Sequence, residues 1–193
     1  MKQSIVKILL ENAVEHMRSS LSAHRENNIP EEIRHSISAH LMAALALEGF
    51  ANQISENVLD KWVWRRIEKM DTPLKWHFIS GLNGLKPFGP PDQPLQIVQK
   101  LHSIRNRLVH PKIMDVGDEI IVLESNGNLR RNVPIDEKVK DGDTILVGYG
   151  KLFDEFNSSS AQKVVECSIN AVKQLIGHLS ITGLEWVDNF KEG

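Results

Sequence analysis

The chain has 193 residues, of which 41% are hydrophobic and 25% are charged, and its formal net charge at pH 7 is −2. These values are typical of a folded domain and argue against intrinsic disorder, a fibrous protein, or a surface coated in positive charge for binding duplex nucleic acid. A single cysteine, Cys167, argues against a disulfide framework or a thiolate zinc cluster, and no apolar run is long enough for a transmembrane helix. We therefore expect one domain, residues 1–193, in a cytoplasmic protein that does not enter a membrane.

The N-terminal part of the chain is predicted to form two long helices. Apolar residues recur every three to five positions over residues 3–25, which is typical of an amphipathic helix. Pro30, followed by Glu31 and Glu32, favours the start of a second helix, because proline is tolerated in a first turn and carboxylates suit its positive end. This second helix is expected over residues 30–57.

Two polar residues interrupt the apolar stripe of the second helix. Glu48 and Asn52 are four residues apart, so they lie on one face of that helix. One interpretation is that they are partly exposed or bonded to neighbouring backbone. The other is that they support a functional site by orienting the basic stretch described below.

Two shorter helices are predicted next, over residues 59–70 and 74–85, with Asp71 or Thr72 as an N-cap for the second. In the first of these helices, core contacts are expected from Trp62 and Ile67. A cationic cluster on the same helix is typical of a solvated face and comprises Arg65, Arg66 and Lys69. Three further aromatic residues suit either base stacking or the core, and the core is favoured: Trp64, Trp76 and Phe78.

A proline- and glycine-rich connection over residues 84–94 leads to a helix that extends to about residue 109. The apolar stripe of this helix is predicted to be buried and comprises Leu95, Val98, Leu101, Ile104 and Leu108. Its C-terminal end carries most of the candidate site residues.

The composition changes over residues 113–150, which are expected to form a small β-rich insertion. Strands are predicted at 119–124, 129–133 and 144–149, and Asn126-Gly127 is a hairpin signal between the first two. The final long helix is expected over residues 159–179, with its N-cap supplied by one of Ser158, Ser159 and Ser160. The tail that follows, with Trp186 and Phe190, is expected to lie back across the helices.

The predicted fold class is therefore mainly α. We expect a helical bundle of about five to six helices, with a small antiparallel β insertion between the helix that ends near residue 109 and the last long helix.

The stretch over residues 100–112 concentrates positive charge and contains no carboxylate. Its ionisable residues are Lys100, His102, Arg105, Arg107, His110 and Lys112. At about 100° per residue, His102, Asn106 and His110 share one face of a helix, and Arg105 lies on the flank of that face. His110 precedes Pro111 and is expected at the C-terminal end of the helix, where the helix dipole raises the pKa of an imidazole.

An arginine beside a histidine is suited to phosphate chemistry. The guanidinium can bind two phosphate oxygens, and the imidazole can transfer a proton near neutral pH. Cleavage of RNA without a metal needs a base, an acid and a cation, and one chain offers one well-placed histidine, or two if His102 contributes. A nuclease of this kind would therefore be expected to act as a symmetric dimer.

No cofactor or metal is expected. The sequence has no glycine-rich phosphate loop and no His-Glu-x-x-His pattern. The four histidines of the first two helices are too loosely spaced for a convincing metal site, namely His16, His24, His35 and His40.

The run from Arg105 and Asn106 to His110 has the form Arg-Asn-x-x-x-His and resembles the signature of the HEPN superfamily of helical-bundle proteins. The resemblance covers roughly residues 30–112 and the final helix, and it leaves out the insertion at 113–150. It implies a metal-independent endoribonuclease or RNA-binding protein of a toxin–antitoxin or phage-defence system, which forms a dimer through the motif helix and has a partner protein such as an antitoxin.

By the same resemblance, Arg105 would bind phosphate, His110 would be the acid and base, and Asn106 would orient the histidine or contact RNA. The residues expected to assist substrate binding are His102, Arg107, Lys112 and Lys100. Two alternatives stay open: a non-catalytic regulatory or protein-interaction module that uses the same surface, and a purely structural use of Arg105, Asn106 and His110.

Overall fold

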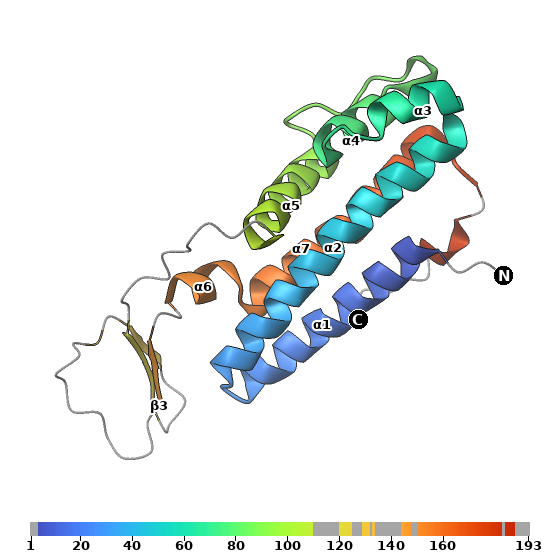
Figure 1. Cartoon of the computed structure of the whole chain (residues 1–193). Helices are drawn as coiled ribbons and strands as arrows, with labels where there is room; N and C mark the ends of the chain where they lie inside the picture. The colour runs from blue at the N-terminus through green and yellow to red at the C-terminus, as the bar shows by residue number, and fades with distance from the viewer. Residues whose placement is uncertain are drawn as a thin grey trace.

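The computed structural model describes residues 4–109, 120–124, 129–131, 133, 144–147, 150–182 and 184–187. Over these residues the protein is mainly α-helical, as predicted (Figure 1). The helices are α1 (Ile5–Arg25), α2 (Ile29–Val58), α3 (Lys61–Ile67), α4 (Thr72–Ser80), α5 (Gln93–Val109), α6 (Gly150–Glu155) and α7 (Ser158–Leu179). Two 3-10 turns complete them, η1 (Leu82–Gly84) and η2 (Glu185–Val187). Within the described residues, no helix is both long enough and apolar enough to span a bilayer.

The 30-residue helix α2 is the centre of the bundle and packs against α1, α4, α5 and α7 (Figure 1). Its alanines at 39, 43 and 46 are fully buried, and such small side chains let neighbouring helices approach closely. The largest buried side chain is Trp76 of α4, which packs against Phe50 and donates its indole N–H to the carbonyl oxygen of Leu47 at 3.1 Å. The bundle core therefore fixes α4 and α5 against the middle of α2.

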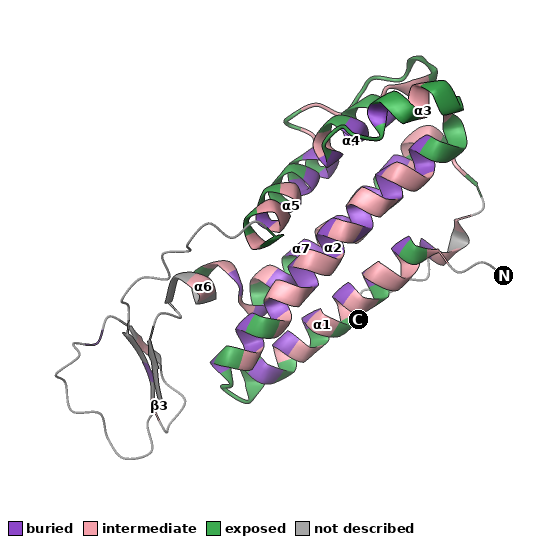
Figure 2. Ribbon diagram, in the orientation of Figure 1, coloured by how far each residue is buried: buried purple, intermediate pink, exposed green. Residues whose placement is uncertain are grey.

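Two aromatic predictions were wrong, and both concern the end of the bundle formed by α3 and α4 (Figure 2). Trp62 is 67% exposed, because α3 is short and buries only Ile67 against the bundle. Phe78 is 38% exposed, whereas Trp76 of the same helix is buried as predicted. Trp64 is half-buried.

The helix ends follow local capping rules, with one correction. Asp71 caps α4 by accepting a hydrogen bond from the backbone N–H of Leu74, as predicted. The N-cap of α7, however, is Asn157 rather than one of the three serines. Two reciprocal hydrogen bonds form a capping box at this helix start. The side chain of Asn157 accepts from the backbone N–H of Ser160, and the hydroxyl of Ser160 accepts from the backbone N–H of Asn157.

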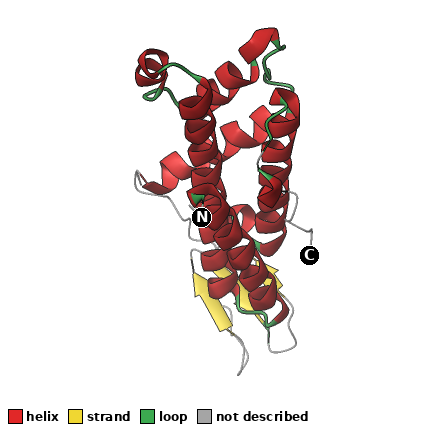
Figure 3. Ribbon diagram, turned by 90° about the vertical axis from the view of Figure 1, so that its right-hand side faces the viewer, coloured by secondary structure: helices red, strands yellow, loops and turns green. Residues whose placement is uncertain are grey.

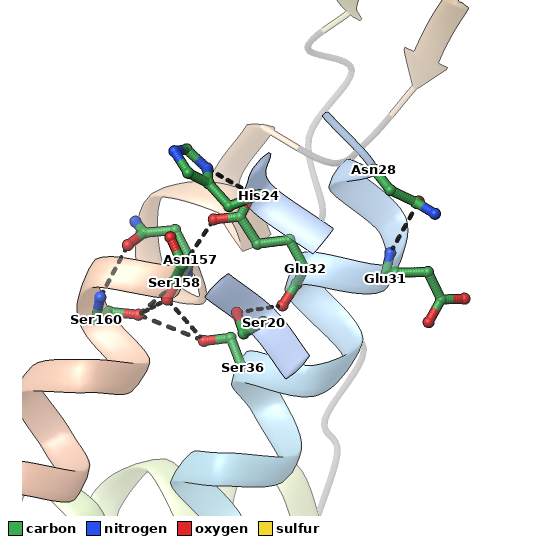
Figure 4. Close-up of polar contacts among 9 residues, drawn as sticks. All are labelled: Ser20, His24, Asn28, Glu31, Glu32, Ser36, Asn157, Ser158 and Ser160. Carbon is green, nitrogen blue, oxygen red and sulfur yellow. Dashed lines mark hydrogen bonds and ion pairs between the residues drawn. The ribbon is translucent and has the colours of Figure 1, made fainter. Parts of the chain in front are cut away.

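Glu32 joins three helices at the opposite end of the bundle (Figure 4). Its side chain is 1% exposed and accepts a hydrogen bond from the backbone N–H of Ser158, at the start of α7, at 2.8 Å. The same carboxylate lies 3.0 Å from Nδ1 of His24 in α1, and the hydroxyl of Ser20 donates to the backbone carbonyl of Glu32. Glu32, which was predicted to favour the start of α2, thus also places a carboxylate at the positive N-terminal end of α7.

The described strands are β1 (Ile120–Leu123), β2 (Leu129–Arg131) and β3 (Thr144–Val147) (Figure 3). They form an antiparallel sheet in the order β2-β1-β3, in which Val122 pairs with Arg130 on one side and with Ile145 on the other. The predicted hairpin residues Asn126 and Gly127 lie outside the described residues, as does Phe190 of the tail. The short helix α6 was not predicted.

Candidate functional site

Helix α5 presents the candidate residues because its opposite face is anchored in the core. Leu95, Val98, Leu101 and Ile104 are all less than 5% exposed, as the predicted stripe requires. The fifth member, Leu108, is only half-buried and packs at the edge of a small cluster around Ile104. Burial of this stripe turns the polar residues of the last two turns of α5 away from the core.

His102, Arg105 and Asn106, which we call the α5 cluster, are joined by hydrogen bonds. The side-chain oxygen of Asn106 accepts from Nη1 of Arg105 at 3.0 Å. The Asn106 amide nitrogen donates to Nε2 of His102, also at 3.0 Å. Because Nε2 of His102 acts as the acceptor in this arrangement, the neutral imidazole carries its proton on Nδ1. Asn106 therefore orients both ionisable neighbours.

Glu48 of α2 faces the α5 cluster. Its carboxylate lies 3.8 Å from Nη2 of Arg105, and the two side chains are 34% and 28% exposed. The Nε atom of Arg105 is buried and has no hydrogen-bond partner among the described residues. Arg105 is thus held from two sides, by Glu48 and Asn106, while part of its donor capacity is unused.

Arg105, His102 and Glu48 line a narrow recess between α2, α4 and α5. The other lining residues are Ala44, Leu47, Thr72, Val98 and Leu101. The recess offers about 10 Å³, which is at the lower limit for holding one water molecule. It cannot hold a nucleotide, so any substrate of the α5 cluster must bind at the surface above it.

Asn52, the second polar residue predicted on this face of α2, receives a different cation. Its side-chain oxygen accepts from Nζ of Lys75 in α4 at 2.8 Å. Lys75 is 4% exposed, and its burial lowers the pKa of its ammonium. The nearby carboxylates oppose this shift by raising the pKa, and Glu48 has the largest effect among them. The Lys75 ammonium also lies 5.6 Å from the ring of Trp64.

Lys75 is a site residue that was not predicted from the sequence. The available signal was its place within the otherwise largely apolar run LKWHFI over residues 74–79, next to the buried Trp76. A lysine in such a run is expected to need a partner, and Asn52 is that partner.

Of the remaining candidates, the structure describes Arg107 and Lys100. Arg107 donates two hydrogen bonds to Glu155 of α6, which raises the pKa of its guanidinium, so its charge is neutralised within the chain. Lys100 is exposed on α5. His110 and Lys112 lie outside the described residues.

The four histidines of α1 and α2 are placed in three different settings. Nδ1 of His16 lies 3.2 Å from Nδ1 of His35, whereas His24 contacts Glu32. His40 is fully buried, donates from Nδ1 to the carbonyl of Ser36 and packs edge-on against Phe156. In the part of the chain that the structure describes, no group of three or more His, Cys, Asp or Glu side chains could hold a metal ion.

Comparisons of the chain with protein-family models, with curated proteins and with solved structures found no match. Function is therefore argued from the α5 cluster itself, together with the motif that it belongs to.

Proposed function

We propose that this chain is a HEPN-like protein that acts on RNA, with residues 1–193 as one domain and a β-rich insertion at 113–150. Within that proposal it is a candidate metal-independent endoribonuclease of a toxin–antitoxin or phage-defence system. The observation that supports the proposal best is the α5 cluster, in which Arg105 is oriented by Asn106 and Glu48 while its side chain stays 28% exposed.

The chemistry assigns one role to each residue of the motif. Arg105 binds a phosphate oxygen and stabilises the negative charge that develops on phosphorus during cleavage. His110 transfers the proton, as base for the 2′-hydroxyl or as acid for the departing 5′ oxygen. Asn106 fixes the orientation of Arg105, and His102 assists substrate binding.

A second copy of the chain completes this site. One chain supplies one imidazole at the end of the motif, whereas cleavage needs both an acid and a base. A symmetric dimer through α5 would bring two such ends together across a twofold axis.

The proposal is tested by incubating the purified protein with structured and unstructured RNA in EDTA. Wild-type protein is expected to cleave, and Arg105→Ala and His110→Ala are each expected to lower the rate by about 100-fold or more. Arg34→Ala is the matched control, because it removes an arginine from an exposed ion pair with Glu31 on α2. Cleavage that survives both motif substitutions would overturn the assigned roles.

A non-catalytic regulatory or interaction module is the second candidate. It is favoured by the pairing of Arg105 with Glu48 and of Arg107 with Glu155, which neutralises positive charge that a substrate would otherwise meet. No cleavage of any RNA, combined with retention of a partner protein by the α5 surface, is the outcome that would select this candidate.

A further inference from the structure

The outer face of α3 combines an exposed indole with unpaired positive charge. At about 100° per residue, Trp62 and Arg65 lie about 140° and 160° from Ile67, the buried residue of this helix, and Arg66 lies about 100° from it. Lys69, just beyond the end of α3, is also exposed. We call Trp62, Arg65, Arg66 and Lys69 the α3 platform. Among the described residues, none of its three cations forms an ion pair with a carboxylate.

The exposed indole distinguishes this face from an ordinary solvated one. Trp62 is 67% accessible, although tryptophan is among the side chains that gain most from burial. The guanidinium of Arg66 lies 4.1 Å from the centre of the Trp62 ring, within the range of a cation–π contact. This contact places a cation against the exposed ring. An exposed aromatic ring beside several cations is a feature of binding surfaces.

The α3 platform differs in its electrostatics from α5. Arg105 and Arg107 each have a carboxylate partner within the chain, whereas Arg65 and Arg66 have none among the described residues. The free positive charge that attracts a polyanion is therefore better supplied by α3 than by the motif helix.

Contacts from Trp64, on the side of α3 that faces α4, lead towards the α5 cluster. The ring of Trp64 faces the Lys75 ammonium, and Lys75 donates to Asn52. Asn52 stands one turn from Glu48, which in turn contacts Arg105. From Glu48 to the C-terminal end of α2 the helix rises about 15 Å, a distance that a few nucleotides span.

We propose that the α3 platform is a binding site for single-stranded RNA, from which the bound strand extends towards the α5 cluster. Bases stack on Trp62 and on the guanidinium plane of Arg66, while Arg65, Arg66 and Lys69 neutralise phosphates. The inference rests on the proposed function and specifies where on the protein the RNA substrate is bound. Tryptophan and arginine also occur together in protein interfaces, so an acidic polypeptide is the competitor in the test.

The test measures fluorescence anisotropy of a labelled, unstructured 2′-O-methyl oligoribonucleotide, which cannot be cleaved because its 2′ oxygens are blocked. Trp62→Ala is expected to weaken binding about five- to tenfold, and Trp62→Phe to stay within about twofold of wild type because a ring is retained. Neutralising Arg65 and Arg66 together with alanine is expected to weaken binding more than about tenfold. It should also reduce the slope of log K against log salt by about 0.7 for each cation removed.

The matched control is Arg18→Ala, which removes an exposed cation from α1. It is expected to leave the affinity within about twofold of wild type, since a distant exposed charge is largely screened. Circular dichroism and melting temperature confirm that each variant is folded.

Four results would overturn the inference: wild-type affinity in the α3 variants, an equal loss in Arg18→Ala, competition by polyglutamate as effective as that by RNA, or no binding of a single-stranded probe by the wild-type protein. The proposed function fails separately, when Arg105→Ala cleaves natural RNA as fast as wild type. If Arg105→Ala loses cleavage while the α3 variants bind RNA normally, the α3 platform is rejected as a binding site and the proposed function stands.

Discussion

The carboxylate of Glu48 on α2 lies 3.8 Å from the guanidinium of Arg105 on α5. This contact joins the two helices at the point where the motif begins, and it gives Arg105 a second constraint besides Asn106. Because both side chains are about one third exposed, the pair contributes little to stability, on the order of 0–1 kcal/mol. Its effect is therefore expected on the position of Arg105 rather than on folding.

Glu48→Gln separates these two effects. We expect the free energy of unfolding to change by less than about 1 kcal/mol, and the rate of RNA cleavage to fall about tenfold because Arg105 loses one of its two supports. Glu11→Gln is the control, since Glu11 forms an exposed ion pair with Lys7 on α1. Cleavage equal to wild type in Glu48→Gln would contradict a positioning role for Glu48.

Glu32 is expected to be among the polar residues on which the fold depends most. Its buried carboxylate accepts from the backbone of Ser158, so Glu32→Ala leaves a buried N–H without an acceptor at the start of α7. We expect a loss of about 2–4 kcal/mol, measured by urea unfolding. Glu31→Ala, one residue earlier and half-buried in an ion pair with Arg34, should cost less than about 1 kcal/mol. Equal losses in the two variants would contradict the role of Glu32.

The buried imidazole of His40 makes stability depend on pH. Burial lowers its pKa below the ordinary value of 6.5, and the charge of Lys100 lowers it further. The hydrogen bond to the backbone carbonyl of Ser36 raises the pKa, but by less than burial lowers it. The unfolded chain then binds a proton at a higher pH than the folded chain does. The contribution of His40 is fully present above pH 6.5 and is lost as the pH falls below that value.

His40→Asn tests this dependence, because an amide nitrogen can replace the donor to Ser36 without titrating. The variant is expected to be less stable at pH 7.5, since it leaves a cavity, but to lose less stability between pH 7.5 and pH 5. The pKa of His35 is also lowered, chiefly by burial and by His16, so His35→Asn is measured in parallel. An unchanged pH slope in His40→Asn would show that His40 does not control it.

Two tryptophans predicted to lie in the core should respond very differently to truncation. Trp76 is fully buried and hydrogen-bonded to Leu47, so Trp76→Ala is expected to cost about 3–5 kcal/mol. Trp62 is 67% exposed, and Trp62→Ala should cost less than about 0.5 kcal/mol. Melting temperatures of the two variants provide the comparison, and a large loss in Trp62→Ala would contradict the exposure of α3.

The main helices were predictable because periodicity is a local property of the chain. The observed α1, α2, α5 and α7 begin and end within about two residues of the predicted bounds. Short elements carried less information: the seven residues of α3 hold an isolated apolar residue, Trp62, between two arginines, besides the apolar side that includes Ile67. Sequence alone did not decide which of them faces the bundle.

Partners that are distant in sequence were not predictable. Glu32 and Ser158 come together only after α1, α2 and α7 have packed, and the same holds for Lys75 and Asn52. Within α5, by contrast, the four-residue spacing of His102 and Asn106 sufficed to place them on one face, where they form a hydrogen bond. Spacing within a helix thus predicted which residues share a face, and tertiary packing decided which charges are paired.

Cleavage of RNA in EDTA by Arg105→Ala and Arg105→Lys, beside wild type, tests the proposed role of α5 most directly. We predict that Arg105→Ala lowers the single-turnover rate by about 100-fold or more. Arg105→Lys should recover only part of this loss, because a lysine ammonium lacks the planar set of N–H donors with which a guanidinium can bond to Asn106 and to a phosphate together. Equal rates for the three proteins would contradict an RNA-cleaving site at Arg105.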